Sequence, residues 1–265
     1  MNATVTPAEE SSDLRLVLPG RSTPAGSGWD WLKGGWDLFI RAPLMWIISL
    51  VLVFVCVVAL ALVPLLGQVA VHLLQPVILA GFMVACRSLE RGGDFELDHL
   101  LAGFKKNFGN LVVVGLLFLV GEIVILLFFL AFLVFTVGTA FLMGSSDQIL
   151  ATIMAAGLTI ALGGLIALAL LLPLMAAYWF APVLVVMHDL PPLEAMKASF
   201  FACFANFIPF LVYSILMIPL FILAAIPFGL GFLVVVPMTI ASIYVSYREI
   251  FTEEEAPAPA KPTFA

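Results

Sequence analysis

Six long apolar segments occupy most of the chain and leave few folds open to it. A helix needs about 20 residues to cross the hydrocarbon core of a bilayer, and no backbone amide can stay unpaired in lipid. Charged residues make up only 11% of the 265 residues, whereas an ordinary soluble domain carries about 25%. The sequence therefore predicts an all-α integral membrane protein with six transmembrane helices. The segments are Leu44–Leu66, Val69–Leu89, Phe108–Leu142, Ile149–Met187, Phe207–Pro227 and Leu230–Tyr247.

Lysine and arginine residues lie on one side of these segments. All 11 stand before the first segment, at the end of the second or between it and the third, between the fourth and fifth, or after the sixth. The turns on the other side are short, and Asp147 is the one charged residue in them. Positively charged loops stay in the cytoplasm. The distribution therefore predicts that both termini are cytoplasmic.

The third and fourth segments are longer than one crossing requires. As a single helix, Ile149–Met187 would be about 58 Å long at about 1.5 Å per residue, against a hydrocarbon core of about 30 Å. A break near Gly163–Gly164 or Pro173 would add a span, and would then move Lys197 and Arg248 to the outer side. The charge distribution therefore favours long tilted helices, the fourth with a kink at Pro173.

An amphipathic stretch precedes the first, third and fifth segments. Each stretch contains a small residue, then an aromatic residue, then an apolar residue four positions later. Residues of the second segment recur in the sixth at identical spacing, from Pro76 to Arg87 and from Pro237 to Arg248. We therefore predict three helical hairpins, each preceded by a cytoplasmic interfacial amphipathic helix. The shared residues are Gly35/Trp36/Ile40, Gly103/Phe104/Phe108 and Ser199/Phe200/Phe204.

Aromatic side chains of these stretches are candidate membrane anchors, because tryptophan rings prefer the headgroup level. In the first stretch Trp29, Leu32, Trp36 and Phe39 fall on one helical face. Simple anchoring and a collar that binds lipid or a protein partner both remain open. The predicted interfacial anchors are Trp29, Trp31, Trp36, Phe104 and Phe200.

The two ends of the chain differ in composition from the rest. Residues 1–28 and 251–265 lack long apolar runs and are rich in small residues and proline. Such composition is typical of disorder. We therefore expect disordered tails on either side of a single membrane domain, residues 29–250.

Glu122 is the candidate intramembrane polar site. It lies near the middle of the third segment, where a carboxylate is costly and usually faces the interior of a helix bundle. Two interpretations are open: a proton or cation site, or a protonated carboxyl that holds a neighbouring helix by a hydrogen bond. His72, at the outer end of the second segment, either pairs with Asp147 or meets the outer headgroups.

Motifs for catalysis or cofactor binding are absent from the sequence. It contains no P-loop, no GxSxG and no HExxH motif, and its three cysteines form no CxxC pair. We therefore expect no enzyme activity, no catalytic residue, no metal site and no cofactor. Sparse basic residues argue against nucleic acid as a partner. For chemistry on lipid at the cytoplasmic face, only His99, His188 and Asp189 are available.

The stretch from Tyr178 to Phe200, YWFAPVLVVMHDLPPLEAMKASF, followed by Asn206–Phe210, resembles a group of uncharacterised six-pass bacterial inner-membrane proteins. These proteins look akin to the membrane region attached to some glycerophosphodiester phosphodiesterases. The resemblance covers residues 29–250 and implies a fold and a bacterial inner-membrane location. It implies no activity, and no phosphodiesterase catalytic domain is present.

These observations together favour a non-catalytic role. We expect a protein that organises the membrane or binds membrane lipids or a partner, which includes a second copy of the chain. The alternative function is a small transporter or channel that uses Glu122.

Overall fold

The computed structural model describes residues 15–143 and 149–253. Within them, six helical segments are long and apolar enough to cross a membrane. This confirms the all-α membrane class. The segments are α2 (Pro43–Ala61), α3 (Leu66–Glu90), α5 (Phe108–Met143), α6 (Ile149–Trp179) with α7 (Ala181–His188), α9 (Phe207–Ala225) and α10 (Phe232–Phe251).

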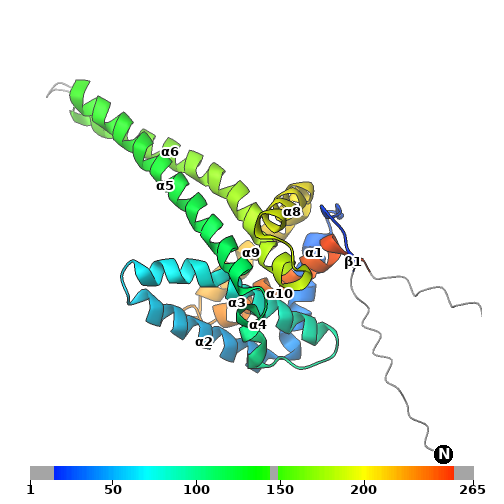
Figure 1. Cartoon of the computed structure of the whole chain (residues 1–265). Coiled ribbons are helices and arrows are strands. Elements are labelled where there is room, and N and C mark those ends of the chain that lie inside the picture. The colour runs from blue at the N-terminus through cyan, green and yellow to red at the C-terminus, as the bar shows by residue number, and fades with distance from the viewer. Residues whose placement is uncertain (1–14, 144–148, 254–265) are drawn as a thin grey trace, which may run out of the picture.

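Shorter elements lie before, between and after these helices. In Figure 1, α5 and α6 run side by side and project from the rest of the molecule, while α2 and α3 form a second pair. The two short strands pair with each other at the end of the molecule opposite the projecting tips of α5 and α6. We call this the terminal end. The shorter elements are β1 (Arg15–Leu16), α1 (Ser27–Arg41), the 3₁₀ helix η1 (Leu97–Leu101), α4 (Ala102–Lys105), α8 (Pro192–Ala205) and β2 (Thr252–Glu253).

The fourth apolar segment is interrupted at Phe180, and not at Gly163–Gly164 or Pro173 as considered from the sequence. Helix α6 continues through Pro173, and α7 begins after Phe180 with Pro182 in its first turn. Proline has no N–H to donate, so it is tolerated at this position. The Phe180 N–H donates to Ser199 Oγ at 2.9 Å. The amide at the interruption therefore has a partner within the protein, as a membrane environment requires.

Part of each predicted tail is ordered. Strand β1 pairs antiparallel with β2, Arg15 opposite Glu253. The Val17 N–H donates to Phe251 O at 2.8 Å, and the Thr23 N–H donates to the buried Asn206 side chain at 2.7 Å. Composition did not reveal this order because backbone hydrogen bonds and the burial of a single large side chain, Phe251, hold these residues. The remainder of both tails lies outside the described residues.

Helix α1 packs against α9 and α10. A Cβ atom added at Gly35 would lie 2.6 Å from Met238 O, so only glycine permits this approach. The residues predicted to share one apolar face of α1 are divided: Leu32 and Phe39 are buried, whereas Trp29 and Trp36 are exposed. Trp31, outside that face, takes the inward position.

The small residue of each predicted repeat lies against the backbone of a membrane-capable helix. Gly35 approaches Met238 O of α10, and Gly103 approaches Val77 O of α3. Ser199 donates to Ala176 O of α6 at 2.6 Å. Three short helices thus dock through the same sequence position. The helices α4 and α8 dock on the span that precedes them, whereas α1 docks on the last span.

The core lies towards the terminal end of the molecule. Most side chains of α2 and of α6 are exposed instead, as expected of helices surrounded by lipid tails that are as apolar as leucine. The largest fully buried side chains are Trp31, Trp46, Tyr244, Tyr247, Phe180 and Phe251.

Candidate functional site

Glu122 meets a histidine from another helix. Its Oε2 lies 3.3 Å from His72 Nδ1, and about a third of each side chain is exposed. His72 Nδ1 is itself buried and makes no well-aligned hydrogen bond within the described residues. The two atoms are therefore close together without the alignment of a hydrogen bond. Asp147, the partner considered for His72, lies outside the described residues.

Two glycines bring the helices of this site together. A Cβ atom at Gly115 of α5 would lie 2.7 Å from His72 O of α3. A Cβ atom at Gly121 would lie 2.6 Å from a methyl carbon of Leu174 in α6. Close approach of this kind is the usual role of small residues in membrane helices. It places Glu122 where α3, α5 and α6 converge.

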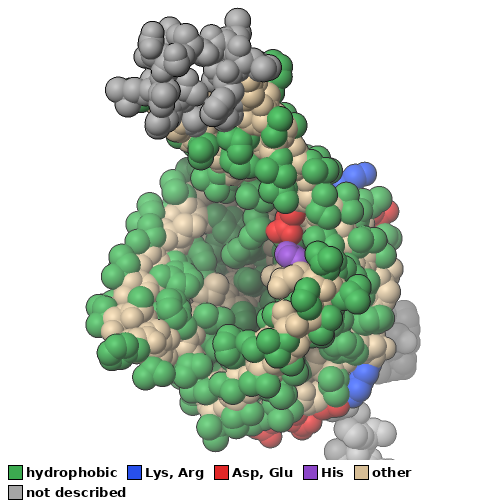
Figure 2. Space-filling model, turned by 90° about the vertical axis from the view of Figure 1, so that its left-hand side faces the viewer, with side chains coloured by type: hydrophobic (Ala, Val, Ile, Leu, Met, Phe, Trp, Pro, Cys, Tyr) green, Lys and Arg blue, Asp and Glu red, His purple; other side chains and the backbone are tan. Residues whose placement is uncertain are grey.

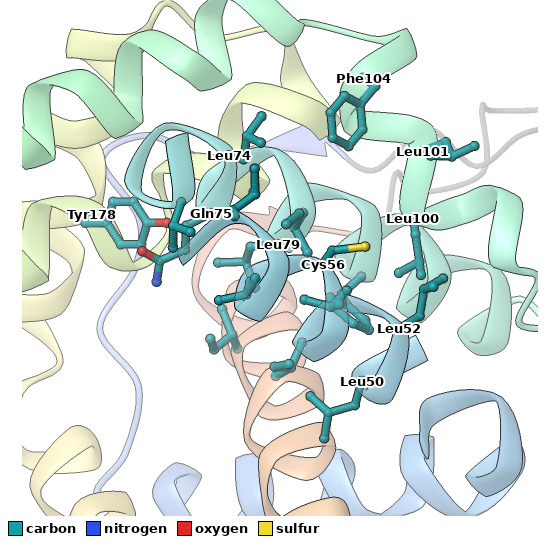
Figure 3. A pocket seen from close by; sticks show the side chains of 18 of the residues that line it. Leu50, Leu52, Cys56, Leu74, Gln75, Leu79, Leu100, Leu101, Phe104 and Tyr178 are labelled. Carbon is teal, nitrogen blue, oxygen red and sulfur yellow. The ribbon is translucent and has the colours of Figure 1, made fainter. Parts of the chain in front are cut away.

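Polar atoms of α3 and α6 extend the site. The ring of Tyr178 lies 4.6 Å from Phe118, one helical turn before Glu122. The Tyr178 hydroxyl and the Trp179 indole N–H are both buried without a hydrogen-bond partner in the described structure. Figure 3 shows Tyr178 together with Gln75, which lies one turn after His72, at one end of a cavity.

This cavity has a volume of about 530 Å³. Its walls come from α2, α3, η1, α4, α6 and α10, and most of its lining is apolar. The lining includes Leu52 and Cys56 of α2, Leu79 of α3 and Phe104 of α4 (Figure 3). Figure 2 shows a hollow in an otherwise apolar face, with an acidic and a histidine side chain beside it. A volume of this size suits a small molecule or part of a lipid.

The arrangement places an imidazole beside a carboxyl group within the membrane-capable part of the molecule. Ionisable groups at such a depth usually pair with one another, and they often lie on ion or proton paths.

The predicted interfacial anchors fall into three environments. Trp29 and Trp36 are exposed, as an anchor requires, and Phe200 is half-buried. Phe104 is 44% exposed and lines the cavity. Trp31 is a correction, because only 1% of it is exposed and its indole N–H donates to Glu249 Oε2 at 2.5 Å. It belongs to the α1–α10 interface.

The residues considered for lipid chemistry have separate partners. His99 Nδ1 accepts from the Glu96 N–H at 3.1 Å, and His188 Nε2 lies 2.6 Å from the Tyr247 hydroxyl. Asp189 accepts from the Asn107 amide at 2.5 Å. That bond, together with the charge of Lys106, holds the pKa of Asp189 below its ordinary value of 3.8. Each group therefore serves a local contact.

Metal ligands do not gather in the part of the chain that the structure describes. Residues 15–143 and 149–253 contain no group of three histidine, cysteine or acidic side chains that could hold an ion.

The sequence had suggested Glu122 but missed its partner. The signal that could have found it is His72 itself, the one histidine within the first three apolar segments.

Comparisons with known proteins agree with the fold. A family model described as "Protein of unknown function (DUF975)" matches residues 29–254. A probable inner membrane protein of Burkholderia thailandensis is 32% identical over 262 residues, which cover 90% of this chain and 96% of the relative. No solved structure matches the chain.

Proposed function

Since the chain belongs to the DUF975 family of unknown function and is a multi-pass inner-membrane protein, we propose that it is non-catalytic and binds membrane lipid in its intramembrane cavity. The apolar cavity of about 530 Å³ between α2, α3, α6 and α10 carries this proposal. Its lining offers an acyl chain the contacts that it makes in a bilayer. Gln75, an exposed side chain of the lining, offers a hydrogen bond to an ester group.

Filling the cavity tests the proposal. Cys56 lines it, whereas the neighbouring Val55 is exposed and does not. Native mass spectrometry of protein extracted from its own membranes is expected to show retained lipid for the wild type and for Val55→Trp. Cys56→Trp is expected to lose it. Equal lipid retention by the two tryptophan variants would show that the cavity does not hold the lipid.

The docking pattern supports an organising role at the membrane surface. We propose that α1, η1 with α4, and α8 lie at the headgroup level, each followed by a helical hairpin. The exposed Trp29 and Trp36 would anchor α1 there. The partners would be membrane lipids, with a protein partner or a second copy of the chain as open alternatives. Kinship with the membrane region of glycerophosphodiester phosphodiesterases stays a prediction.

Charge supports a cytoplasmic position for the terminal end. Arginine and lysine residues flank α1, α3, α4 and α10 there, including Arg41, Arg87 and Arg248. Positive loops are retained in the cytoplasm. Fusion of green fluorescent protein to the C-terminus should therefore give fluorescent cells, and fusion of alkaline phosphatase should give an inactive enzyme. The reverse pattern would place the terminal end outside.

One observation favours the alternative, a small transporter or channel that uses Glu122. His72 lies 3.3 Å from Glu122 and places an imidazole next to this intramembrane acid. Proteoliposomes that contain a pH-sensitive dye would show proton movement in the wild type and none in Glu122→Gln. If the two proteins give equal traces in every tested ion gradient, the alternative fails.

A further inference from the structure

Arg87 is a half-buried cation that lacks an anionic partner. It lies at the terminal end of α3, where one of its terminal nitrogens contacts Met187 Sδ of α7 at 3.7 Å. A thioether is only a weak acceptor. The Arg87 Nε is buried and bonds to none of the described residues. A half-buried guanidinium without an anion is costly. Its second terminal nitrogen neither bonds to the described residues nor is fully buried, so it suits an anion that binds from outside the chain.

The acidic side chains near Arg87 are already engaged. Glu90 accepts from the Tyr244 hydroxyl at 2.6 Å and from Arg248 Nε at 2.8 Å. Asp189 accepts from Asn107 and lies 3.5 Å from Lys106 Nζ. Among the described residues, Arg87 forms no ion pair. No acidic side chain of the described residues therefore neutralises the positive charge of Arg87.

Two further polar groups stand beside Arg87. His188 follows Met187 in the chain, and its Nε2 lies 2.6 Å from the hydroxyl of the buried Tyr247. Arg87, His188 and Tyr247 come from α3, α7 and α10, which pack against one another or meet through these side chains. Three rigid elements thus hold these polar groups in place, as a binding site requires.

We propose that Arg87, with His188 and Tyr247, forms a site for a phosphate group that carries a net negative charge. The planar guanidinium matches two phosphate oxygens at once. Arg87 is three residues from the end of α3, the level at which lipid phosphates lie. The phosphate belongs to an anionic lipid headgroup or is free phosphate. The site uses neither the cavity nor Glu122, so it is independent of the proposed function.

Thermal unfolding of the full chain in a neutral detergent tests the site. The probes are dihexanoyl phosphatidylglycerol, dihexanoyl phosphatidylcholine and inorganic phosphate. We expect the phosphatidylglycerol to raise the Tm of the wild type. Arg87→Gln should need about tenfold more phosphatidylglycerol for the same rise in Tm, because a hydrogen bond to a charged group is lost. Arg41→Gln removes a cation of the same end that donates to Leu89 O, and should respond like the wild type.

The probes separate the two sources of phosphate. A rise with phosphatidylglycerol alone assigns a lipid headgroup, and an equal rise with inorganic phosphate assigns free phosphate. An unchanged response of Arg87→Gln, a response to phosphatidylcholine equal to that of phosphatidylglycerol, or no response of the wild type would overturn the proposal. If Arg87→Gln does not fold, Arg87→Lys replaces it, and it should also bind more weakly because lysine lacks the planar fork.

Discussion

Replacing Gly35 with alanine tests whether α1 is a docked part of the membrane domain. A Cβ atom at this position would lie 2.6 Å from Met238 O, whereas non-bonded heavy atoms pack about 3.5 Å apart. The backbone oxygen cannot rotate away, so α1 must withdraw by roughly 0.9 Å. Overpacking of this kind costs about 1–3 kcal/mol. The gain in helix propensity from glycine to alanine returns about 0.5–1 kcal/mol.

A matched glycine removes the propensity effect from the comparison. Gly164 also lies inside a helix, and a Cβ atom there would meet no atom within 4 Å. Gly164→Ala should therefore keep only the propensity gain. Equilibrium unfolding in mixed micelles should show Gly35→Ala to be less stable than Gly164→Ala by about 1–3 kcal/mol. If the two variants are equally stable, α1 does not dock on α10 as described.

Three more predictions concern individual side-chain contacts. Trp31→Phe removes the hydrogen bond to a carboxylate and should lower the free energy of unfolding by about 1–3 kcal/mol. Trp29→Phe, at an exposed position, should change that free energy by less than about 0.5 kcal/mol. Equal effects of the two substitutions would contradict the inward position of Trp31. A double-mutant cycle of His72→Ala and Glu122→Gln should give a coupling of about 0.5–3 kcal/mol in unfolding experiments, and additive effects would show that the pair does not interact. The folded-state pKa of Asp189 is lowered, so the ionised carboxylate contributes stability above pH 3.8, and this stability is lost as the pH falls through the folded-state pKa. Asp189→Asn should therefore remove this part of the acid dependence of the unfolding free energy measured between pH 6 and pH 3. An unchanged pH profile would show that Asp189 makes no such contribution.

The apolar pattern was sufficient to predict the membrane-capable helices. Most ends differ from the prediction by only a few residues, because apolar length and the first charged residue are both visible in the sequence. The docking positions Gly35, Gly103 and Ser199 were also visible as a repeat. The partner on which each of them docks was not, because sequence periodicity identifies a helix face but not the helix that covers it.

The candidate site shows the same limit. Glu122 stands out because a carboxylate within an apolar run is costly. Its partner His72 is 50 positions earlier, and only the relative register of α3 and α5 brings the two together. Trp31 was misplaced because the inward face of α1 is marked by Gly28 and Gly35, which carry no hydrophobic signal. Close packing between helix backbones at glycine positions is therefore hard to predict from the hydrophobic pattern of the sequence.

The order of the chain adds a consequence to the position of α1. Trp31 and its partner Glu249 are 218 positions apart, so at roughly 5–20 residues per second a ribosome needs roughly 11–44 s to supply the partner after the tryptophan. During that time α10 is missing from the inward face of α1, and α9 alone can cover the part of Trp31 that meets Phe210 and Tyr213. An incomplete chain can insert its first spans, but it cannot complete the burial of this face. Complete burial of the first helix therefore reports that synthesis has reached the last span.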